Sequence, residues 1–366
     1  MKILILTNSD LGLYKFRKEL LQCLINQGNE VFISLPDGKF VQSMVAMGCH
    51  FIPTSLERRG MNPLKDLILL LQYKKILQKI EPDVVLTYTI KPNIYGGIVC
   101  RICRVKYIEN ITGLGTAIES EGALSKVLLL LYKIGLKGAA QVFFQNKRNQ
   151  KFFKVKGIIK KSKLIPGSGV NLQEHCYEEY PDTDEVRFLF IGRIMRDKGI
   201  DELLICAKYI SKKYKNVYFD LIGDYDEEKY RDEIAFLEKT GTIKYLGSQD
   251  NVHAFIRSHH AVVLPSYHEG LSNVLLEAAA CGRPVLATLV PGCREAFADG
   301  ISGIGFSAKS SDALIRAVEK FISLSYEKRK EMGVRGREKM VQEFDRRLVI
   351  SAYMDEICKS EEKNKV

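Results

Sequence analysis

Residues 261–287 read A-V-V-L-P-S-Y-H-E-G-L-S-N-V-L-L-E-A-A-A-C-G-R-P-V-L-A, and they contain the clearest signal of the fold class. Ala261–Leu264 is a short apolar, β-branched run, which is typical of a buried strand. Asn273–Cys281 is predicted to be a helix, because a glycine and then a proline follow it closely. Pro284–Ala287 is a second apolar run of strand length. A strand, a helix and a strand in this order predict parallel strands joined by a helix.

The same alternation runs through the whole chain. In the first half the expected strands are Lys2–Leu6, Glu30–Leu35, His50–Pro53, Asp83–Tyr88, Lys106–Asn110 and Gln141–Gln145. In the second half they are Val186–Gly192, Val217–Gly223, Ile243–Leu246, Ala261–Leu264 and Pro284–Ala287. At 366 residues the chain exceeds a comfortable single core. We therefore expect an α/β protein with two doubly wound, Rossmann-like domains, each built on a parallel sheet, that face a cleft.

The predicted domain boundary falls in Asn171–Glu185, where polar and acidic residues interrupt the alternation like a linker. The first domain would comprise residues 1–170 and 343–366, and the second would comprise residues 171–342. The last helix has no strand after it and is expected to cross back to the first domain. Its apolar residues at helical spacing are Val341, Phe344, Leu348 and Ala352.

Composition points to a globular protein of the cytoplasm. With 46% hydrophobic and 27% charged residues, the chain resembles neither a disordered nor a membrane-spanning protein. No apolar run approaches the roughly 18–20 residues that a spanning helix needs. The nine cysteines are an odd number, which argues against a disulfide framework. Cys100 and Cys103 form a single C-x-x-C, which we interpret as ordinary cysteines on a helix.

The positive charge is concentrated in the first half of the chain. Residues 1–180 contain 26 Lys and Arg against 14 Asp and Glu, whereas the rest of the chain is close to neutral. Such asymmetry predicts an anionic partner for the first domain. The run 146–163 holds eight basic residues and no acidic one. Phe152–Phe153 and Ile158–Ile159 within it favour a membrane surface, unless these side chains pack inward and the lysines are merely solvated.

Glu269 and Glu277 are eight positions apart, which a helix would convert to roughly 12 Å along its axis. They cannot form the close carboxylate pair of a retaining hydrolase, which needs roughly 5 Å. They can hold the two ends of an extended ligand. Between them lie Gly270 and Leu271, followed by Ser272, Asn273 and Val274, whose amides begin the helix and favour phosphate. A nucleotide-sugar, with phosphates between a sugar and a ribose, fits this layout.

Three motifs in order carry a family resemblance. They are I-G-R-I-M-R-D-K-G (191–199), H-E-G-L-S-N-V-L-L-E (268–277) and V-P-G-C-R-E (290–295). Together they resemble the donor-site motifs of retaining family-4 glycosyltransferases of GT-B fold. In the first half, T-Y-T-I-K-P-N-I-Y-G (87–96) and I-T-G-L-G (111–115) are similar to bacterial transferases that extend polyprenyl-diphosphate-linked sugars. N-acetylgalactosaminyl, galacturonosyl and capsule transferases are the nearest in pattern. Ile90 departs from the histidine of many relatives.

The resemblance implies a role for each matching residue. Arg193 and Lys198 would neutralise the diphosphate that departs, and Gly192 belongs to the same turn. Glu269 would bind hydroxyls of the donor sugar and Glu277 those of the ribose. Gly12, after the first strand, would bring a backbone amide close to the β-phosphate. On the acceptor side, the resemblance points to Lys91, Asn93 and Thr112.

The resulting hypothesis is a retaining hexosyltransferase that needs no metal or other cofactor. It would use a UDP-sugar, with N-acetylgalactosamine as first choice, and a polyprenyl-diphosphate-linked saccharide at the cytoplasmic face of the inner membrane. A GT-B epimerase of UDP-N-acetylhexosamine and a basic nucleic-acid-binding protein remain alternatives, although no nucleic-acid motif accompanies the basic run. Asp224-Tyr225-Asp226 imitates a metal-binding D-x-D, but the following acidic residues favour a solvated helix start. His268 is interpreted as pocket wall.

Overall fold

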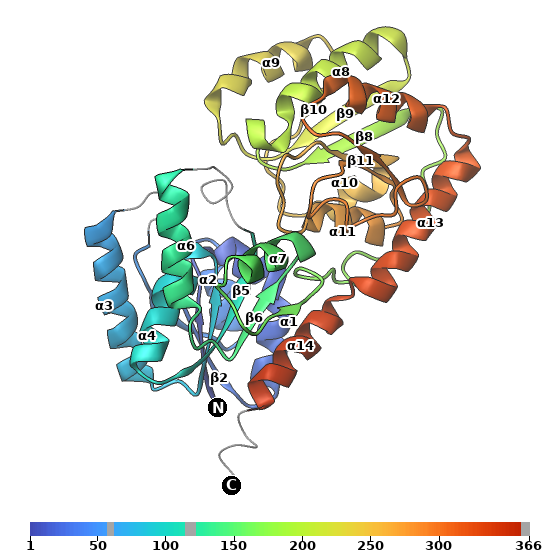
Figure 1. Cartoon of the computed structure of the whole chain (residues 1–366). Helices are drawn as coiled ribbons and strands as arrows, with labels where there is room; N and C mark the ends of the chain where they lie inside the picture. The colour runs from blue at the N-terminus through green and yellow to red at the C-terminus, as the bar shows by residue number, and fades with distance from the viewer. Residues whose placement is uncertain (57–61, 114–121, 360–366) are drawn as a thin grey trace. The chain divides into compact units, whose positions relative to one another are not determined.

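The computed structural model describes residues 1–56, 62–113 and 122–359 (Figure 1). The chain divides into two compact units, Met1–Ser168 with Arg347–Val366, and Gly169–Arg346. These divisions lie two to four residues from the boundaries expected from the sequence. The reason is that Val170 exchanges backbone hydrogen bonds with both sides of Asp345, which keeps residues 169–170 and 344–346 in one unit.

The first unit is built on a seven-stranded parallel sheet, in the order β3-β2-β1-β4-β5-β6-β7. Its strands are β1 (Lys2–Leu6), β2 (Glu30–Leu35), β3 (His50–Pro53), β4 (Val84–Tyr88), β5 (Lys106–Ile111), β6 (Gln141–Phe144) and β7 (Lys163–Leu164). Its helices are α1 (Asp10–Asn26), α2 (Val41–Ala46), α3 (Pro63–Ile80), η1 (Pro92–Gly96), α4 (Gly97–Ile102), α6 (Ala123–Gly135), α7 (Lys147–Val155) and α14 (Arg346–Cys358). The short edge strand β7 is not anticipated from the sequence.

The second unit repeats this architecture with a six-stranded parallel sheet, in the order β10-β9-β8-β11-β12-β13. Its strands are β8 (Val186–Ile191), β9 (Val217–Ile222), β10 (Lys244–Tyr245), β11 (Ala261–Leu264), β12 (Val285–Thr288) and β13 (Gly303–Phe306). Its helices are η2 (Arg196–Lys198), α8 (Ile200–Lys213), η3 (Glu228–Tyr230), α9 (Arg231–Lys239), α10 (His253–Ser258), α11 (Asn273–Ala280), α12 (Ser311–Ile322) and α13 (Tyr326–Glu343). The two doubly wound parallel sheets expected from the sequence are confirmed, and β13 is an addition.

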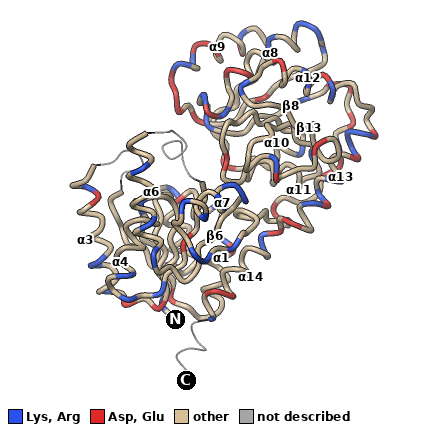
Figure 2. Tube along the Cα trace, in the orientation of Figure 1, with Lys and Arg blue, Asp and Glu red and all other residues tan. Residues whose placement is uncertain are grey.

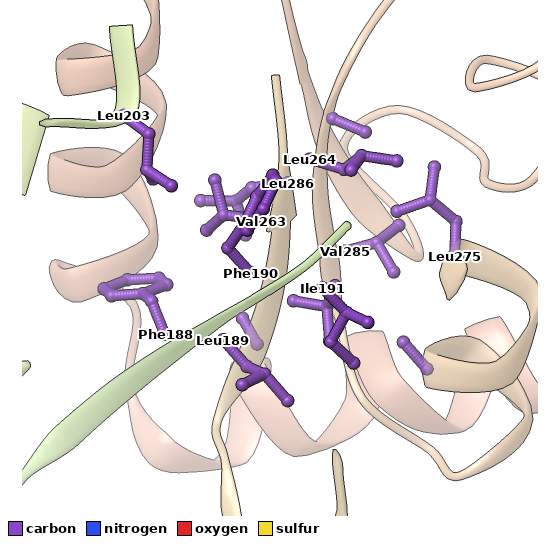
Figure 3. Close-up of a cluster of buried hydrophobic side chains, with 14 of the residues drawn as sticks. Phe188, Leu189, Phe190, Ile191, Leu203, Val263, Leu264, Leu275, Val285 and Leu286 are labelled. Atoms are coloured by element: carbon purple, nitrogen blue, oxygen red, sulfur yellow. The ribbon is translucent and has the colours of Figure 1, made fainter. Parts of the chain in front are cut away.

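The core of the second unit explains why its strands read as continuous apolar runs. Successive residues of β8 point to opposite faces, and helices cover both. Phe188 lies toward Leu203 of α8, and it stacks edge-on against Phe321 of α12 (Figure 3). On the other face, Ile191 points toward Leu275 of α11 (Figure 3). Every residue of β8 therefore loses water on folding, apart from the half-buried Arg187.

The strand order places a ligand-binding position in each unit. Order reverses between β1 and β4 in the first sheet and between β8 and β11 in the second. In open parallel sheets, ligands bind beyond the carboxyl ends of the strands at such a switch point. In the second unit, the turns that follow β8 and β11 are those that carry the first two of the three motifs.

Two expectations about the joining segments are wrong. The last helix is two helices, α13 and α14, which are separated at Phe344–Asp345; Val341 and Leu348 are exposed rather than packed. The return to the first domain is confirmed, because Val349 and Tyr353 of α14 lie in the core of the first unit. The segment 171–185 is not a free linker, since Arg283 donates to the carbonyl oxygens of Glu178 and Glu179 and holds it to the second unit.

The structure also shows which apolar faces are buried in α3 and in the basic run. The stripe of α3 formed by Leu64, Leu67, Ile68 and Leu71 is exposed, and the opposite stripe of Leu69, Tyr73, Leu77 and Ile80 is buried. In the basic run, Phe153, Ile158 and Ile159 are buried in the core around α6, so these side chains pack inward. Within the described ranges, no helix combines the length and the apolar character that crossing a bilayer requires.

Candidate functional site

The turn after β8 positions two cationic side chains in the second unit. Arg193 leaves the strand directly, and Lys198 ends η2 just before α8. Gly199 joins them to α8 with φ of +73°, and a Cβ there would meet the carbonyl oxygen of Pro265. The backbone of this turn is therefore pressed against the turn that follows β11. Gly192 donates its amide to Ile222, so that amide is used within the sheet.

The turn after β11 brings Glu269 to Lys198. The Nζ of Lys198 lies 2.5 Å from Oε1 of Glu269, and both side chains are mostly buried, with 19% and 13% exposed. A charge pair so removed from water interacts strongly and fixes the positions of both groups. Residues that lie 71 positions apart in sequence thus form one charged centre at the switch point. The structure brings these two predicted residues together.

The V-P-G-C-R-E turn supports Glu269 from behind. Gly292 has φ of +87°, and a Cβ there would meet the backbone carbonyl of Glu269. Its amide donates to the carboxylate of Glu295 at 2.6 Å, and its carbonyl accepts the amide of Ser272 at 2.8 Å. The thiol of Cys293 is buried beside them, and burial keeps its pKa above the usual range. The close approach of this turn to its backbone leaves Glu269 little freedom to move.

Helix α11 begins at the same place without a side-chain cap. The hydroxyl of Ser272, its N-cap, accepts no amide hydrogen bond, whereas five other described helices have Ser or Asn caps that do. Amides at an uncapped helix start can hold an anion. The side-chain oxygen of Asn273 is buried with no hydrogen-bond partner. Gly270 and Leu271 complete the approach to the helix.

Glu277 lies one turn into α11, half-buried, and Val274 precedes it on the first turn. The helix begins at Asn273, so only the second half of the eight steps from Glu269 is helical. The helical spacing used in the sequence argument therefore describes only the part from Asn273 to Glu277. Glu269 lies four residues before the start of α11 and Glu277 lies four residues after it.

Arg193 has an acidic partner in the loop that follows β9. Its Nη1 lies 3.2 Å from Oδ2 of Asp226, with about half of the arginine side chain exposed. This contact uses one acidic residue of the D-x-D segment for an ion pair. The backbone of the segment continues the sheet, because Ile194 bridges Tyr225.

A buried hydrogen bond holds the floor of the turn after β11. The hydroxyl of Tyr267 lies 2.8 Å from both carboxylate oxygens of Glu202 on α8. The backbone amide of Tyr267 donates to the carbonyl oxygen of Asp197. Burial, and then the contact with Glu202, raise the pKa of the Tyr267 hydroxyl, which stays a neutral donor. Sequence reasoning missed this pair, and it quoted Glu295, three residues after Gly292 in the third motif, without giving it a role. The G-x-x-E spacing was the available signal for Glu295.

In the first unit, the predicted residues have partners of their own. Gly12 lies in the first turn of α1, and its amide donates to the cap Ser9 at 3.0 Å. Lys91 pairs with the buried Asp66 at 2.8 Å, which ties η1 to α3. Asn93 is fully buried between Thr87 and the backbone of Asn110. The first unit therefore uses Lys91 and Asn93 to build the end of its sheet.

The chain around these residues is strained. Thr89, between β4 and η1, has φ of +72°, a region that β-branched residues rarely adopt. Strain of this kind gathers at functional sites. Thr112 lies half-buried just after β5, on the neighbouring strand end, and the last two residues of the I-T-G-L-G motif lie outside the described residues. The strained turn at Thr89 was not anticipated from the sequence.

Two overlapping groups among the described residues have metal-ligand chemistry, His175, His253 and Cys281, and Cys176, Glu178 and His253; they form one cluster around His253. His175, His253 and Cys281 approach one another within 4.8 Å at the carboxyl end of α11. Hydrogen bonds account for part of it, since His253 contacts Cys281 at 3.9 Å and Glu178 at 2.9 Å. It lies at the end of α11 that is opposite to Ser272. The cluster therefore does not belong to the charged centre.

Comparison with known proteins gives this geometry a family. Residues 2–146 match the family described as glycosyl transferase 4-like, and residues 178–339 match glycosyl transferases group 1. An N,N'-diacetylbacillosaminyl-diphospho-undecaprenol α-1,3-N-acetylgalactosaminyltransferase of Campylobacter jejuni is 26% identical over 86% of this chain and 87% of its own. The capsular polysaccharide biosynthesis glycosyltransferase CapM of Staphylococcus aureus is 26% identical over 90% of each chain.

Solved structures agree on the fold. A glycosyltransferase from Rickettsia africae superimposes with a TM-score of 0.81 over 98% of both chains, at 17% identity. HepE of Anabaena, solved with UDP and glucose, gives 0.80 over 98% of this chain and all of its own, at 19% identity. The chain belongs to the GT-B glycosyltransferases, with a first half of the glycosyl transferase 4-like family and a second half of glycosyl transferases group 1.

Proposed function

We propose that the protein is a retaining glycosyltransferase that moves a hexose derivative from a UDP-sugar to a polyprenyl-diphosphate-linked saccharide. One observation carries the proposal: the Lys198–Glu269 pair lies at the switch point, beside the uncapped start of α11. A cation and free helix amides suit a diphosphate, and a carboxylate suits sugar hydroxyls. The HepE structures with UDP and UDP-glucose support a UDP-sugar as donor.

The chemistry follows from where the charges are. As the bond between the anomeric carbon and the diphosphate oxygen breaks, negative charge grows on that oxygen. Lys198 and Arg193 would stabilise this charge, which is the transition-state role of preorganised cations. Glu269 would hold hydroxyls of the donor sugar, and Glu277 those of the ribose.

Retention follows from a front-face reaction. No second carboxylate acts as a nucleophile in this scheme, so the acceptor hydroxyl attacks on the side from which the diphosphate leaves. The new bond joins the acceptor oxygen to the anomeric carbon, and the proton of that hydroxyl passes to the departing phosphate. Lys198 and Arg193 supply the positive charge, and no metal is needed.

The acceptor and the sugar are proposed from the relatives. The Campylobacter relative is named for an undecaprenol-diphosphate-linked acceptor and for N-acetylgalactosamine, and CapM for capsular polysaccharide. We propose N-acetylgalactosamine as the donated sugar and surface polysaccharide or glycan assembly as the process. A lipid-linked acceptor places the reaction at the cytoplasmic face of the inner membrane, where the protein would bind peripherally. Lys91 and Thr112 would face the acceptor, near the strained turn at Thr89.

The test is to incubate the full chain with a panel of UDP-sugars and a polyprenyl-diphosphate-linked saccharide, followed by mass spectrometry and NMR of the product. A gain of one sugar, with the anomeric configuration of the donor kept, is the expected result. An altered free N-acetylhexosamine without acceptor would assign the epimerase instead. An inverted product would overturn the front-face reaction. The absence of both sugar transfer and donor turnover would overturn the proposal as a whole.

A further inference from the structure

Two helices of the first unit carry an unusual amount of exposed apolar surface. On α3 these side chains are Leu64, Leu67, Ile68 and Leu71, and on α6 they are Leu124, Val127, Leu130 and Ile134. Their exposed fractions run from 37% to 74%. These eight are two-fifths of the twenty large apolar side chains that are exposed among the described residues. Both helices pack against α4 and η1, so they belong to one side of the unit (Figure 1).

Such surface needs a reason, because both helices have another apolar face in the core. Leu69, Tyr73 and Leu77 bury α3, and Leu128 and Tyr132 bury α6. The exposed residues of α3 therefore add a second stripe at i, i+3, i+4 and i+7, which packing within the unit does not require. Contiguous apolar surface on a folded protein marks an interaction site.

The charges on the same helices have one sign toward solvent. Lys74, Lys75 and Lys79 are exposed on α3, and Lys126 and Lys133 are exposed on α6 (Figure 2). The one acidic residue of α3, Asp66, is buried in its pair with Lys91, and α6 has none. Apolar residues bordered by lysines match a bilayer surface with anionic lipids.

A hollow between α4 and α6 joins the two kinds of surface. It has a volume of about 420 Å³, and it is lined by Leu130 and Ile134 with Arg101, Lys133 and Lys137. Arg101 is fixed at its rim, because Nη1 donates to the carbonyl oxygen of Ile134 at 2.9 Å. An apolar floor with three cations around it suits a phosphate that is attached to a hydrocarbon chain. A nucleic acid would find the phosphate ligands but no partner for the aliphatic floor.

We propose that the exposed faces of α3 and α6 dock the protein on an anionic membrane, with a lipid phosphate held in the hollow by Arg101, Lys133 and Lys137. This inference rests on the proposed function, since a lipid-linked acceptor would require the enzyme to work at a membrane. It assigns docking to a surface other than the basic run around α7. In that run Phe153, Ile158 and Ile159 lie in the core, and Val155 is the one large apolar side chain that is exposed, so no apolar stripe accompanies its lysines.

The experiment measures sedimentation of the full chain with vesicles of phosphatidylcholine, alone or mixed with phosphatidylglycerol. Replacing Arg101, Lys133 and Lys137 with Gln should weaken partition to the mixed vesicles about a hundredfold, at about fivefold per charge. Replacing Leu67, Ile68 and Leu71 with Gln should weaken it at least about tenfold through lost apolar burial.

The matched control replaces Lys151, Lys154 and Lys156 of the basic run with Gln, which removes the same charge from the same unit. Partition of this variant should stay within about threefold of wild type at moderate salt, where screening weakens diffuse attraction. Equal loss in the control variant, or full binding by both test variants, overturns the proposal.

UDP affinity, measured by calorimetry, separates this inference from the proposed function. Both test variants should keep it, because neither alters Arg193, Lys198, Glu269 or Glu277. Wild-type protein that transfers sugar to a soluble acceptor analogue but ignores vesicles would overturn docking alone. Protein that binds vesicles through α3 and α6 but turns over no UDP-sugar would overturn the enzyme proposal and leave docking in place.

Discussion

Replacing Lys198 with Ala tests two roles of this residue, its ion pair with Glu269 in the structure and its proposed contact with the diphosphate. In the structure its ammonium is held 2.5 Å from Glu269, and both side chains are largely buried. The variant leaves the carboxylate without its cation, 13% exposed, beside the backbone of Gly292. The change therefore affects both stability and turnover, by different physical routes.

The two magnitudes can be estimated separately. A mostly buried charged group that loses its partner costs about 1–3 kcal/mol of unfolding free energy. Loss of one preorganised contact to the charge that develops in the transition state lowers turnover about 10²–10³-fold, or about 2.7–4 kcal/mol. Adding Glu269→Gln to the variant removes the unpaired charge, so the double variant should regain stability. It should not regain turnover, because the diphosphate still lacks its cation.

Urea unfolding and UDP-sugar turnover would measure both effects. Lys208→Ala is the matched control, since Lys208 also forms a 2.6 Å pair with a glutamate, Glu233, but in solvent. Its loss should cost about 0–1 kcal/mol and leave turnover unchanged. Turnover of Lys198→Ala within about fivefold of wild type would refute the assignment of Lys198 to the diphosphate. Recovery of activity in the double variant would assign Lys198 a purely structural role.

Three further outcomes follow from the structure. Burial holds the pKa of Glu109 well above its usual range, so the folded state keeps a proton that the unfolded chain loses above about pH 4.3. The free energy of unfolding should then fall as pH rises above that value, by up to about 1.4 kcal/mol per pH unit, until the raised pKa is reached. Glu109→Gln should remove this slope in thermal unfolding measured between about pH 5 and 8. Equal slopes in the variant and the wild type would contradict the raised pKa. Gly292→Ala should lower turnover and stability more than Gly300→Ala does, because both glycines have positive φ but only a Cβ at position 292 would press on Glu269. Equal losses in the two variants would show that backbone strain alone causes the effect. EDTA should leave turnover intact, and loss that manganese restores would instead make the segment Asp224–Asp226 a metal site.

Much of the fold was predictable because parallel strands that are buried on both faces leave a strong local signal. Four expected strands, Lys2–Leu6, Glu30–Leu35, His50–Pro53 and Ala261–Leu264, have the predicted bounds. Two strands were missed: β7 has two residues, too few to show a pattern, and in β13, which reads G-I-G-F, glycines interrupt the apolar run. The break between α13 and α14 was also hidden, because Phe344 continues the helical spacing while its carbonyl oxygen accepts from Val170 and the amide of Arg346 donates to Val170.

Local patterns were enough to predict the alternation of strands and helices, the order of the donor motifs and the residue types at their turns. These depend on local periodicity and on which residues end a helix, so they can be inferred along the chain. The folded structure was needed to show that Lys198 meets Glu269, that Gly292 packs against that glutamate, and which stripe of α3 faces solvent. Each of these depends on contacts between residues far apart in the chain or on which face a sheet covers, and local periodicity carries no information about either.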